Sequence, residues 1–188
     1  RQRVLIMELT QAYLKECFDY DPVTGNLIWR ARPRSHFKTR NASGASGRRV
    51  GQVAGTQVAC WYRFISLDRK PYLAHRLVWF WHHGRFPFRD TDHVNRDRSD
   101  NRIENLRECT RSQNQQSRGS HRASGSRGVE QISVGTWRAR IRSDGRSIHL
   151  GTFFSEKDAA LAYARAAVDY FGKFAPIEAK ELFEASYP

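Results

Sequence analysis

Acidic residues are scarce in this sequence of 188 residues. Asp and Glu number 19 against 32 Lys and Arg, which leaves a formal net charge of +13. From Arg30 to Lys70 there are ten basic residues and one acidic residue, Asp68. An excess of this size favours a polyanionic partner, nucleic acid first, over the alternative of a ribosome-like or simply soluble basic protein. Residues 31–51, rich in Arg, Ser and Gly, predict a flexible loop or a basic arm that orders on phosphates.

Cysteine and long apolar runs are also scarce. The three cysteines, Cys17, Cys60 and Cys109, lie far apart and form no CxxC pair, so neither a structural zinc site nor a disulfide framework is expected. No stretch reaches the ~18 apolar residues of a membrane span, and no signal peptide is recognised. We therefore expect no membrane partner and a reducing, cytoplasmic setting.

Local patterns predict the following order of elements before residue 118: a helix over 4–18, a turn at 21–25, a strand at 26–30, a strand over 57–67, a helix over 71–83 ended by Gly84, a loop over 94–104, a strand over 106–109 and a helix from Thr110. Residues 117–126 are rich in Ser, Gly and Arg and predict a linker. Beyond it, three short runs separated by turn residues, including Asp144-Gly145, predict three strands. Ser155 and Gly172 bound the clearest helix, over 155–171.

One polar segment gathers the groups that phosphodiester hydrolysis requires. The reaction needs a base that takes a proton from water and a cation that stabilises the charge on the departing 3′ oxygen. Asp92 and His93 are adjacent on a predicted strand, so their side chains could flank one phosphate if the strand ends or twists there. Thr110 and Gln113 have the spacing of a capping box, which puts Asn114 on the first turn of a helix. Mg²⁺ prefers oxygen ligands and keeps several waters, so two protein ligands suffice.

The string DHVNRDRSDNRIENLR, followed by an asparagine nine residues past its last asparagine, resembles the His-Asn-His (HNH) endonucleases, in their phage and homing branch with a ββα-metal fold. The resemblance extends from about Tyr62 to Ser117. It implies these roles: His93 as general base, Asp92 and Asn114 as ligands of Mg²⁺ or a substitute such as Mn²⁺, and Asn105 as the holder of the loop that orients His93. Arg96 stands where glycine is expected, so a turn with positive φ would be strained there. His75 is interpreted as a packed or phosphate-contacting residue rather than a second base.

Residues 124–177 resemble the plant Apetala/ethylene-response-factor DNA-binding domain, through SGSRGV, TWRARI, HLGTF and DAALAYARAA. Alternate strand residues share a face, so a row of arginines can meet phosphates and guanine edges. The candidate DNA contacts are Arg127, Trp137, Arg138, Arg140, Arg142 and Arg146, with Arg48 and Arg49 of the basic segment and Arg76 of the helix. The alternative is that Trp137 belongs to the core and the arginines form a solvated face.

The sequence thus predicts an α+β protein in which a ββα-metal nuclease domain is followed by a three-stranded antiparallel sheet packed on one helix. The expected divisions are residues 1–56 (helix, strand and basic arm), 57–118 (nuclease) and 119–188 (DNA-binding domain and tail). The expected activity is Mg²⁺-dependent nicking of double-stranded DNA by a monomer, with a dimer as the alternative, in a bacterial or phage-infected cell. A DNA-binding regulator that keeps an inactive nuclease fold and a binder of structured RNA are the alternatives.

Overall fold

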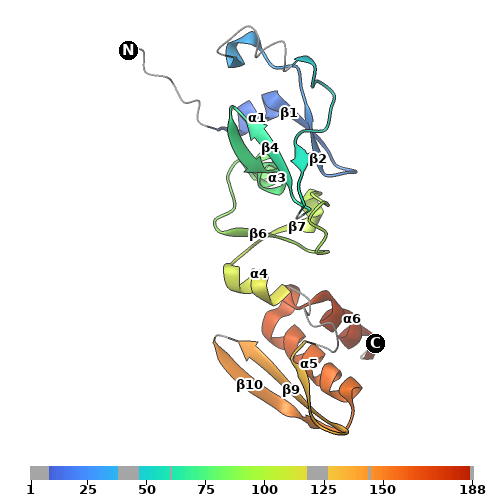
Figure 1. Ribbon diagram of the computed structural model, residues 1–188. Coiled ribbons are helices and arrows are strands. Elements are labelled where there is room, and N and C mark those ends of the chain that lie inside the picture. Colours follow the sequence, from blue (N-terminus) through green and yellow to red (C-terminus); the bar gives the residue numbers. More distant parts are fainter. Residues whose placement is uncertain (1–8, 38–46, 60, 118–126, 144, 187–188) are drawn as a thin grey trace. The chain divides into compact units, whose positions relative to one another are not determined.

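The computed structural model describes residues 9–37, 47–59, 61–117, 127–143 and 145–186 (Figure 1). The chain forms two compact units, Arg1–Glu108 and Cys109–Pro188. Both contain helices and small sheets, so the fold is of mixed α and β type with several small antiparallel sheets. The expected divisions after residues 56 and 118 stay predictions, as does the detailed ββα-metal arrangement.

The first unit contains these elements: α1 (Gln11–Cys17), β1 (Phe18–Asp21), β2 (Asn26–Trp29), the 3₁₀ turn η1 (Arg34–His36), β3 (Thr56–Gln57), β4 (Arg63–Leu67), β5 (Lys70–Leu73), α3 (Ala74–His83), β6 (Asp90–His93), the 3₁₀ turn η2 (Ile103–Asn105) and β7 (Leu106–Cys109), whose last residue enters the second unit. β1 and β2 form a hairpin, and β3, β4 and β5 form a three-stranded antiparallel sheet. The predicted turn closes the hairpin, because Asp21 accepts hydrogen bonds from Val23 N and Thr24 Oγ1.

α3 forms the centre of the first core. Ala74, Leu77 and Val78 have helical spacing and are all buried, which directs one apolar face toward α1, β2 and β4. Gly84 ends the helix at φ 70°, in the left-handed conformation that glycine adopts most readily, and its N–H donates to Phe80 O. The end at Gly84 predicted from the sequence is confirmed.

A two-stranded sheet of β6 and β7 follows α3 in the chain. The short helix α4 (Arg111–Ser117) comes next and begins at the predicted capping box. Thr110 Oγ1 accepts from Gln113 N at 3.2 Å, and Gln113 Oε1 accepts from Thr110 N at 2.8 Å. The capping-box prediction is therefore confirmed in both directions.

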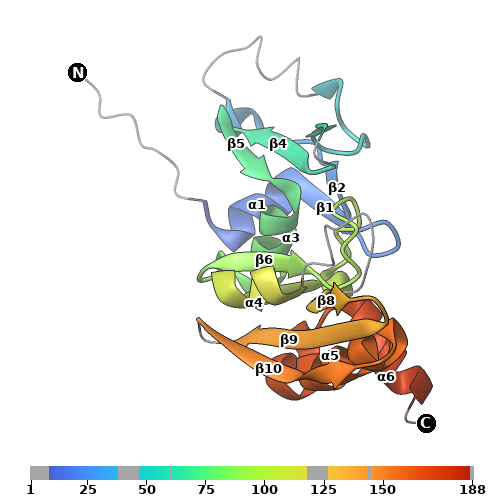
Figure 2. The same cartoon turned by 60° about the horizontal axis from the view of Figure 1, so that its bottom comes forward.

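The second unit continues with β8 (Val129–Ser133), β9 (Thr136–Ser143), β10 (Arg146–Phe153), α5 (Glu156–Phe171), the 3₁₀ turn η3 (Gly172–Phe174) and α6 (Ile177–Ser186). β9 is the central strand of an antiparallel sheet, and α5 packs across that sheet (Figure 2). Ala139 and Ile141 of β9 face a row of buried alanines on α5, whose small side chains let helix and strand approach closely. The Ser155 cap is confirmed, since its Oγ accepts from Asp158 N.

Several predicted bounds are wrong. Phe18 starts β1 instead of continuing the first helix, and residues 4–8 of that helix lie outside the described residues. The single strand predicted over 57–67 is divided between β3 and β4, because Val58 N donates to Tyr62 O and Trp61 takes φ 66°. Residues 71–73 belong to β5, so the next helix begins only at Ala74.

The second unit has one helix more than predicted beside its sheet. α6 packs on α5, with Ala179 buried in the second core, where only a tail was expected from the sequence. Most of the predicted linker 117–126 lies outside the described residues, although Ser117 is the last residue of α4. In the described parts of the chain, no helix has the length and apolar character that crossing a membrane requires.

Candidate active site

Asp92 and His93 are the last two residues of β6 and are both buried, at 7% and 4% exposure. The strand ends there because Arg96 N donates to His93 O at 2.9 Å and starts a turn. Arg96 takes φ 63° in this turn, so the expected positive φ at a non-glycine residue is confirmed. The end of the strand exposes the start of a polar loop, residues 94–104, directly beside the imidazole.

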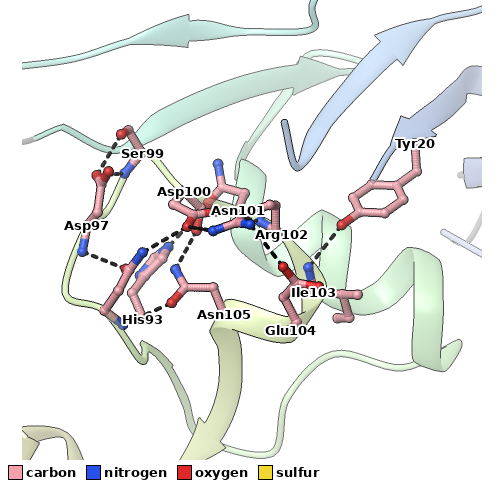
Figure 3. A network of polar contacts seen from close by, with 11 residues as sticks. Tyr20, His93, Asp97, Ser99, Asp100, Asn101, Arg102, Ile103, Glu104 and Asn105 are labelled. Atoms are coloured by element: carbon pink, nitrogen blue, oxygen red, sulfur yellow. Dashed lines mark hydrogen bonds and ion pairs between the residues drawn. The ribbon is translucent and has the colours of Figure 1, made fainter. Parts of the chain in front are cut away.

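Asn105 binds the beginning and the middle of that loop (Figure 3). Its Oδ1 accepts from Asn95 N at 2.9 Å, and its Nδ2 donates to Asp100 O at 2.8 Å. Val94 N donates to Asn105 O at 2.8 Å, which joins β6 to the start of β7. A single buried amide thus closes the loop from Asn95 to Asn105.

Asn101 lies inside the loop and was missed in the reading of the sequence. It is 2% exposed, and its Oδ1 lies 3.2 Å from His93 Nε2. A carbonyl oxygen can only accept, so this contact requires the proton of a neutral imidazole on Nε2 and leaves the lone pair on Nδ1. Burial lowers the pKa of His93, with the Asn101 contact acting in the opposite direction, so the ring is neutral at neutral pH. In the sequence, only the position of Asn101 in the Asp-Asn-Arg triplet of the motif, residues 100–102, could have pointed to this role.

Aromatic rings enclose His93 on the side of α3. His75 lies edge-on to it with ring centroids 5.2 Å apart, and Tyr62 lies 5.3 Å from His75 and 6.2 Å from His93. Burial, the largest effect, and then the neighbouring His93 and Arg76 lower the pKa of His75 to about 3. His75 therefore stays neutral and lines the site beside His93. Arg98, whose guanidinium lies 5.0 Å from the Tyr62 ring centre, adds a positive charge beside Tyr62.

The β1–β2 hairpin supports the loop from outside. Tyr20 Oη accepts a hydrogen bond from Ile103 N at 2.9 Å, across 83 residues of sequence (Figure 3). Gly25, at φ 71°, approaches so closely that an added Cβ would lie 2.2 Å from Arg102 N and 2.3 Å from the Asn101 carbonyl carbon. Arg102 also donates to Asp100, and this contact lowers the pKa of that carboxyl to about 2. The loop is therefore fixed both within itself and against the N-terminal hairpin.

Asp92 has an arginine partner on the neighbouring strand. Arg107 Nε and Nη2 donate to Asp92 Oδ2 at 2.9 and 2.5 Å, and both side chains are largely withdrawn from water. Asn114 belongs to the second unit, in the first turn of α4, where its N–H donates to Thr110 O at 2.9 Å. The approach of Asn114 to Asp92 stays a prediction.

The resemblance implies a divalent cation, and the oxygen atoms available at Asp92 indicate whether the site could bind one. Asp92 contributes a buried carboxylate at the end of a strand, and the predicted second ligand is an amide oxygen. Among the described residues, no three His, Cys, Asp or Glu side chains gather into a group that could hold a metal ion. A cation at Asp92 would therefore take one or two protein oxygens and complete its shell with water, which is the coordination that Mg²⁺ favours. The residues present fit Mg²⁺ or Mn²⁺.

The predicted DNA contacts of the second unit fall into two groups. Arg140, Arg142 and Arg146 are exposed on the sheet, while Arg138 is half-buried. Glu130 pairs with both Arg138, at 2.9 Å, and Arg140, at 3.4 Å. Trp137 packs against the second core, on the same side of β9 as Ala139, and Arg127 donates to the carbonyls of Gln115 and Gln116 at the end of α4. In the first unit, Arg48 and Arg49 are exposed, and Arg76 donates to Arg89 O at 3.3 Å.

Comparison with known proteins bears on the segment that carries the Asp92–His93 pair. Residues 72–116 match the model of the HNH endonuclease family. No curated protein and no solved structure matches the chain. The matched segment runs from β5 to α4 and includes the loop with Asn101 and Asn105, so the buried site described above lies in a segment similar to the HNH endonucleases.

Proposed function

We propose that this protein is a DNA endonuclease that nicks duplex DNA with the help of Mg²⁺, in the manner of homing-type HNH enzymes. The observation that supports this most strongly is the buried, neutral His93, held through Nε2 by Asn101 inside the segment similar to the HNH family. Its lone pair on Nδ1 is the basic group of the site. The net charge of +13 provides the long-range attraction to a polyanionic substrate.

In the proposed reaction, His93 Nδ1 accepts a proton from a water molecule as the water oxygen attacks phosphorus. The P–O bond to the 3′ oxygen breaks, which leaves a 5′-phosphate and, after protonation, a 3′-hydroxyl. Asp92 and Asn114 would hold Mg²⁺, which when bound stabilises the negative charge that develops on the leaving oxygen. Asn105 and Asn101 keep the loop and the imidazole in place, so that little reorganisation is needed during the reaction.

One site of this kind cuts one strand. A monomer therefore produces nicks, and a double-strand break requires two molecules or two successive events. Incubation of supercoiled plasmid with the purified protein, with Mg²⁺ or with a chelator, tests the proposal directly. We expect conversion to the open-circular form only with the cation. Plasmid binding without nicking under both conditions would favour a non-catalytic regulator, and preferential binding and cleavage of structured RNA would favour an RNA substrate.

We further propose that the sheet of the second unit binds DNA through Arg140, Arg142 and Arg146, as in the Apetala/ethylene-response-factor domains. Arg140 and Arg142 are exposed on the face of the sheet opposite the one that packs against α5, so this charged face is available to phosphates. Arg146 is exposed at the start of β10 and pairs with Ser143, on the side of Ile148. Trp137 packs against the second core and Arg127 donates to Gln116 O, and their contacts with DNA stay predictions. For these two residues, a contribution to the fold is the more economical interpretation.

Replacement of Arg140 and Arg142 by glutamine should weaken duplex binding and flatten its dependence on salt. The slope of log K against log[salt] falls by about 0.9 for each phosphate that the protein no longer neutralises, so we expect a decrease of about two. Fluorescence anisotropy with a labelled duplex at several salt concentrations measures this slope. Lys157→Gln combined with Arg165→Gln removes two positive charges from the exposed surface of α5 and serves as the matched control. Equal slopes for the sheet variant and this control would mean that another face contacts DNA.

A further inference from the structure

The contact between Arg107 and Asp92 is a feature of the site that the proposed reaction does not use. Both hydrogen bonds go to the same carboxylate oxygen, Oδ2, from the adjacent strand. The side chains are 14% and 9% exposed, so water screens the pair only weakly. A buried charge that loses such a partner is strongly destabilised, which means that Asp92 needs a cation beside it at all times.

Arg107 and a divalent cation are alternative partners for this carboxylate. Both are positively charged, so they repel each other across Asp92, and a metal ion must share or displace the guanidinium to gain the carboxylate oxygens. A DNA phosphate changes this balance. Its paired oxygens match the planar donor fork of a guanidinium as well as a carboxylate does, so a bound phosphodiester offers Arg107 an equivalent partner.

We propose that Arg107 couples metal binding to DNA binding. In the free protein, Arg107 neutralises Asp92 and keeps its affinity for divalent cations low. When DNA is bound, Arg107 turns its donors toward the scissile phosphate and Asp92 becomes available to the cation. Because such coupling is reciprocal, DNA tightens metal binding by the same factor by which metal tightens DNA binding. The inference rests on the proposed function, which supplies both the cation and the phosphate.

Titration with Mn²⁺, with and without a short DNA duplex, tests the coupling. The electron paramagnetic resonance signal of the free ion measures how much Mn²⁺ is bound. His93→Ala serves as the parent, so that the duplex stays intact, and Arg107→Gln is added to it. We expect the parent to bind Mn²⁺ about tenfold more tightly with DNA than without, the factor that one charge-assisted hydrogen bond supplies. With Arg107→Gln, DNA-free binding should rise by a similar factor, and DNA should change it by less than about twofold.

Two further variants keep the test decisive. Arg85→Gln removes the same charge from the same unit, but its partner is Glu108, so DNA-free Mn²⁺ affinity should stay at the parental value. Arg107→Lys keeps the positive charge but loses the planar pair of guanidinium donors. It provides the test of the coupling if Arg107→Gln does not fold. We expect it to bind DNA-free Mn²⁺ more tightly than the parent but less tightly than Arg107→Gln.

An unchanged or weaker DNA-free affinity in the folded Arg107 variants overturns the coupling, and so does a failure of every variant to bind Mn²⁺. The nuclease proposal is separated from it by the plasmid assay on the unmodified chain. If that chain does not nick DNA although Mn²⁺ binding responds as expected, the proposed reaction fails and the coupling stands as a binding property. If nicking depends on Mg²⁺ but Mn²⁺ binding does not respond to Arg107, the coupling fails and the proposed reaction stands.

Discussion

Replacement of His93 by alanine should reduce Mg²⁺-dependent nicking by a factor on the order of 10³, within the range that a positioned general base contributes. The loss should appear in the rate of strand cleavage and leave duplex affinity nearly unchanged, because the imidazole is 4% exposed and adds no net charge in its neutral form. Single-turnover conversion of supercoiled plasmid measures the rate, and anisotropy with a labelled duplex measures the affinity. Added imidazole should restore part of the activity of His93→Ala.

The proton-accepting role of His93 can be separated from its packing. His93→Gln keeps a polar side chain that can donate to Asn101 Oδ1, but it offers no basic nitrogen. It should therefore be as inactive as the alanine variant while unfolding at nearly the same temperature as the unmodified protein. His83→Gln is the matched control, since His83 stacks on Trp79 at the end of α3. Nicking by His93→Gln at the rate of this control would exclude His93 as the base.

The parts of the fold that follow from local chemistry could be predicted from the sequence. α5 was predictable because Ser155 caps it, Gly172 ends it and its alanines have helical spacing. The interruption between β3 and β4 was not, because residues 58–62 contain neither glycine nor proline. Trp61 takes positive φ in the turn that the hydrogen bond from Val58 N to Tyr62 O closes, and a local pattern carries no sign of that.

The candidate site likewise contains residues that the sequence indicates and residues that only the fold reveals. Asp92, His93 and Asn105 stood out because they belong to one contiguous motif, and the capping box at Thr110 follows from side-chain spacing alone. Asn101 was overlooked because an asparagine in a polar loop is ordinary until burial gives it a single partner. The contact of Tyr20 with the loop spans 83 residues, so only the tertiary fold reveals it.

Gly25 provides the sharpest test of that long-range support. Gly25→Ala places a Cβ 2.2 Å from Arg102 N and 2.3 Å from the Asn101 carbonyl carbon, both of them backbone atoms. The loop must move by about an ångström to make room, and a displacement of that size in a catalytic constellation costs roughly 10² in rate. We expect a fall of this order in single-turnover nicking. The free energy of unfolding should fall by about 1–3 kcal/mol from overpacking, in addition to the conformational cost of alanine at positive φ.

Gly51→Ala separates the crowding from the backbone strain. Gly51 has a similar φ of 79°, but no described atom lies within 4 Å of its added Cβ, so this variant carries only the conformational cost of about 1–2 kcal/mol. It should unfold at a lower temperature than the unmodified protein and still nick DNA at the normal rate. If the two alanine variants nick at the same rate, the N-terminal hairpin does not position the loop. If only Gly25→Ala is slow, the hairpin holds Asn101, and through it the tautomer of His93, in place for catalysis.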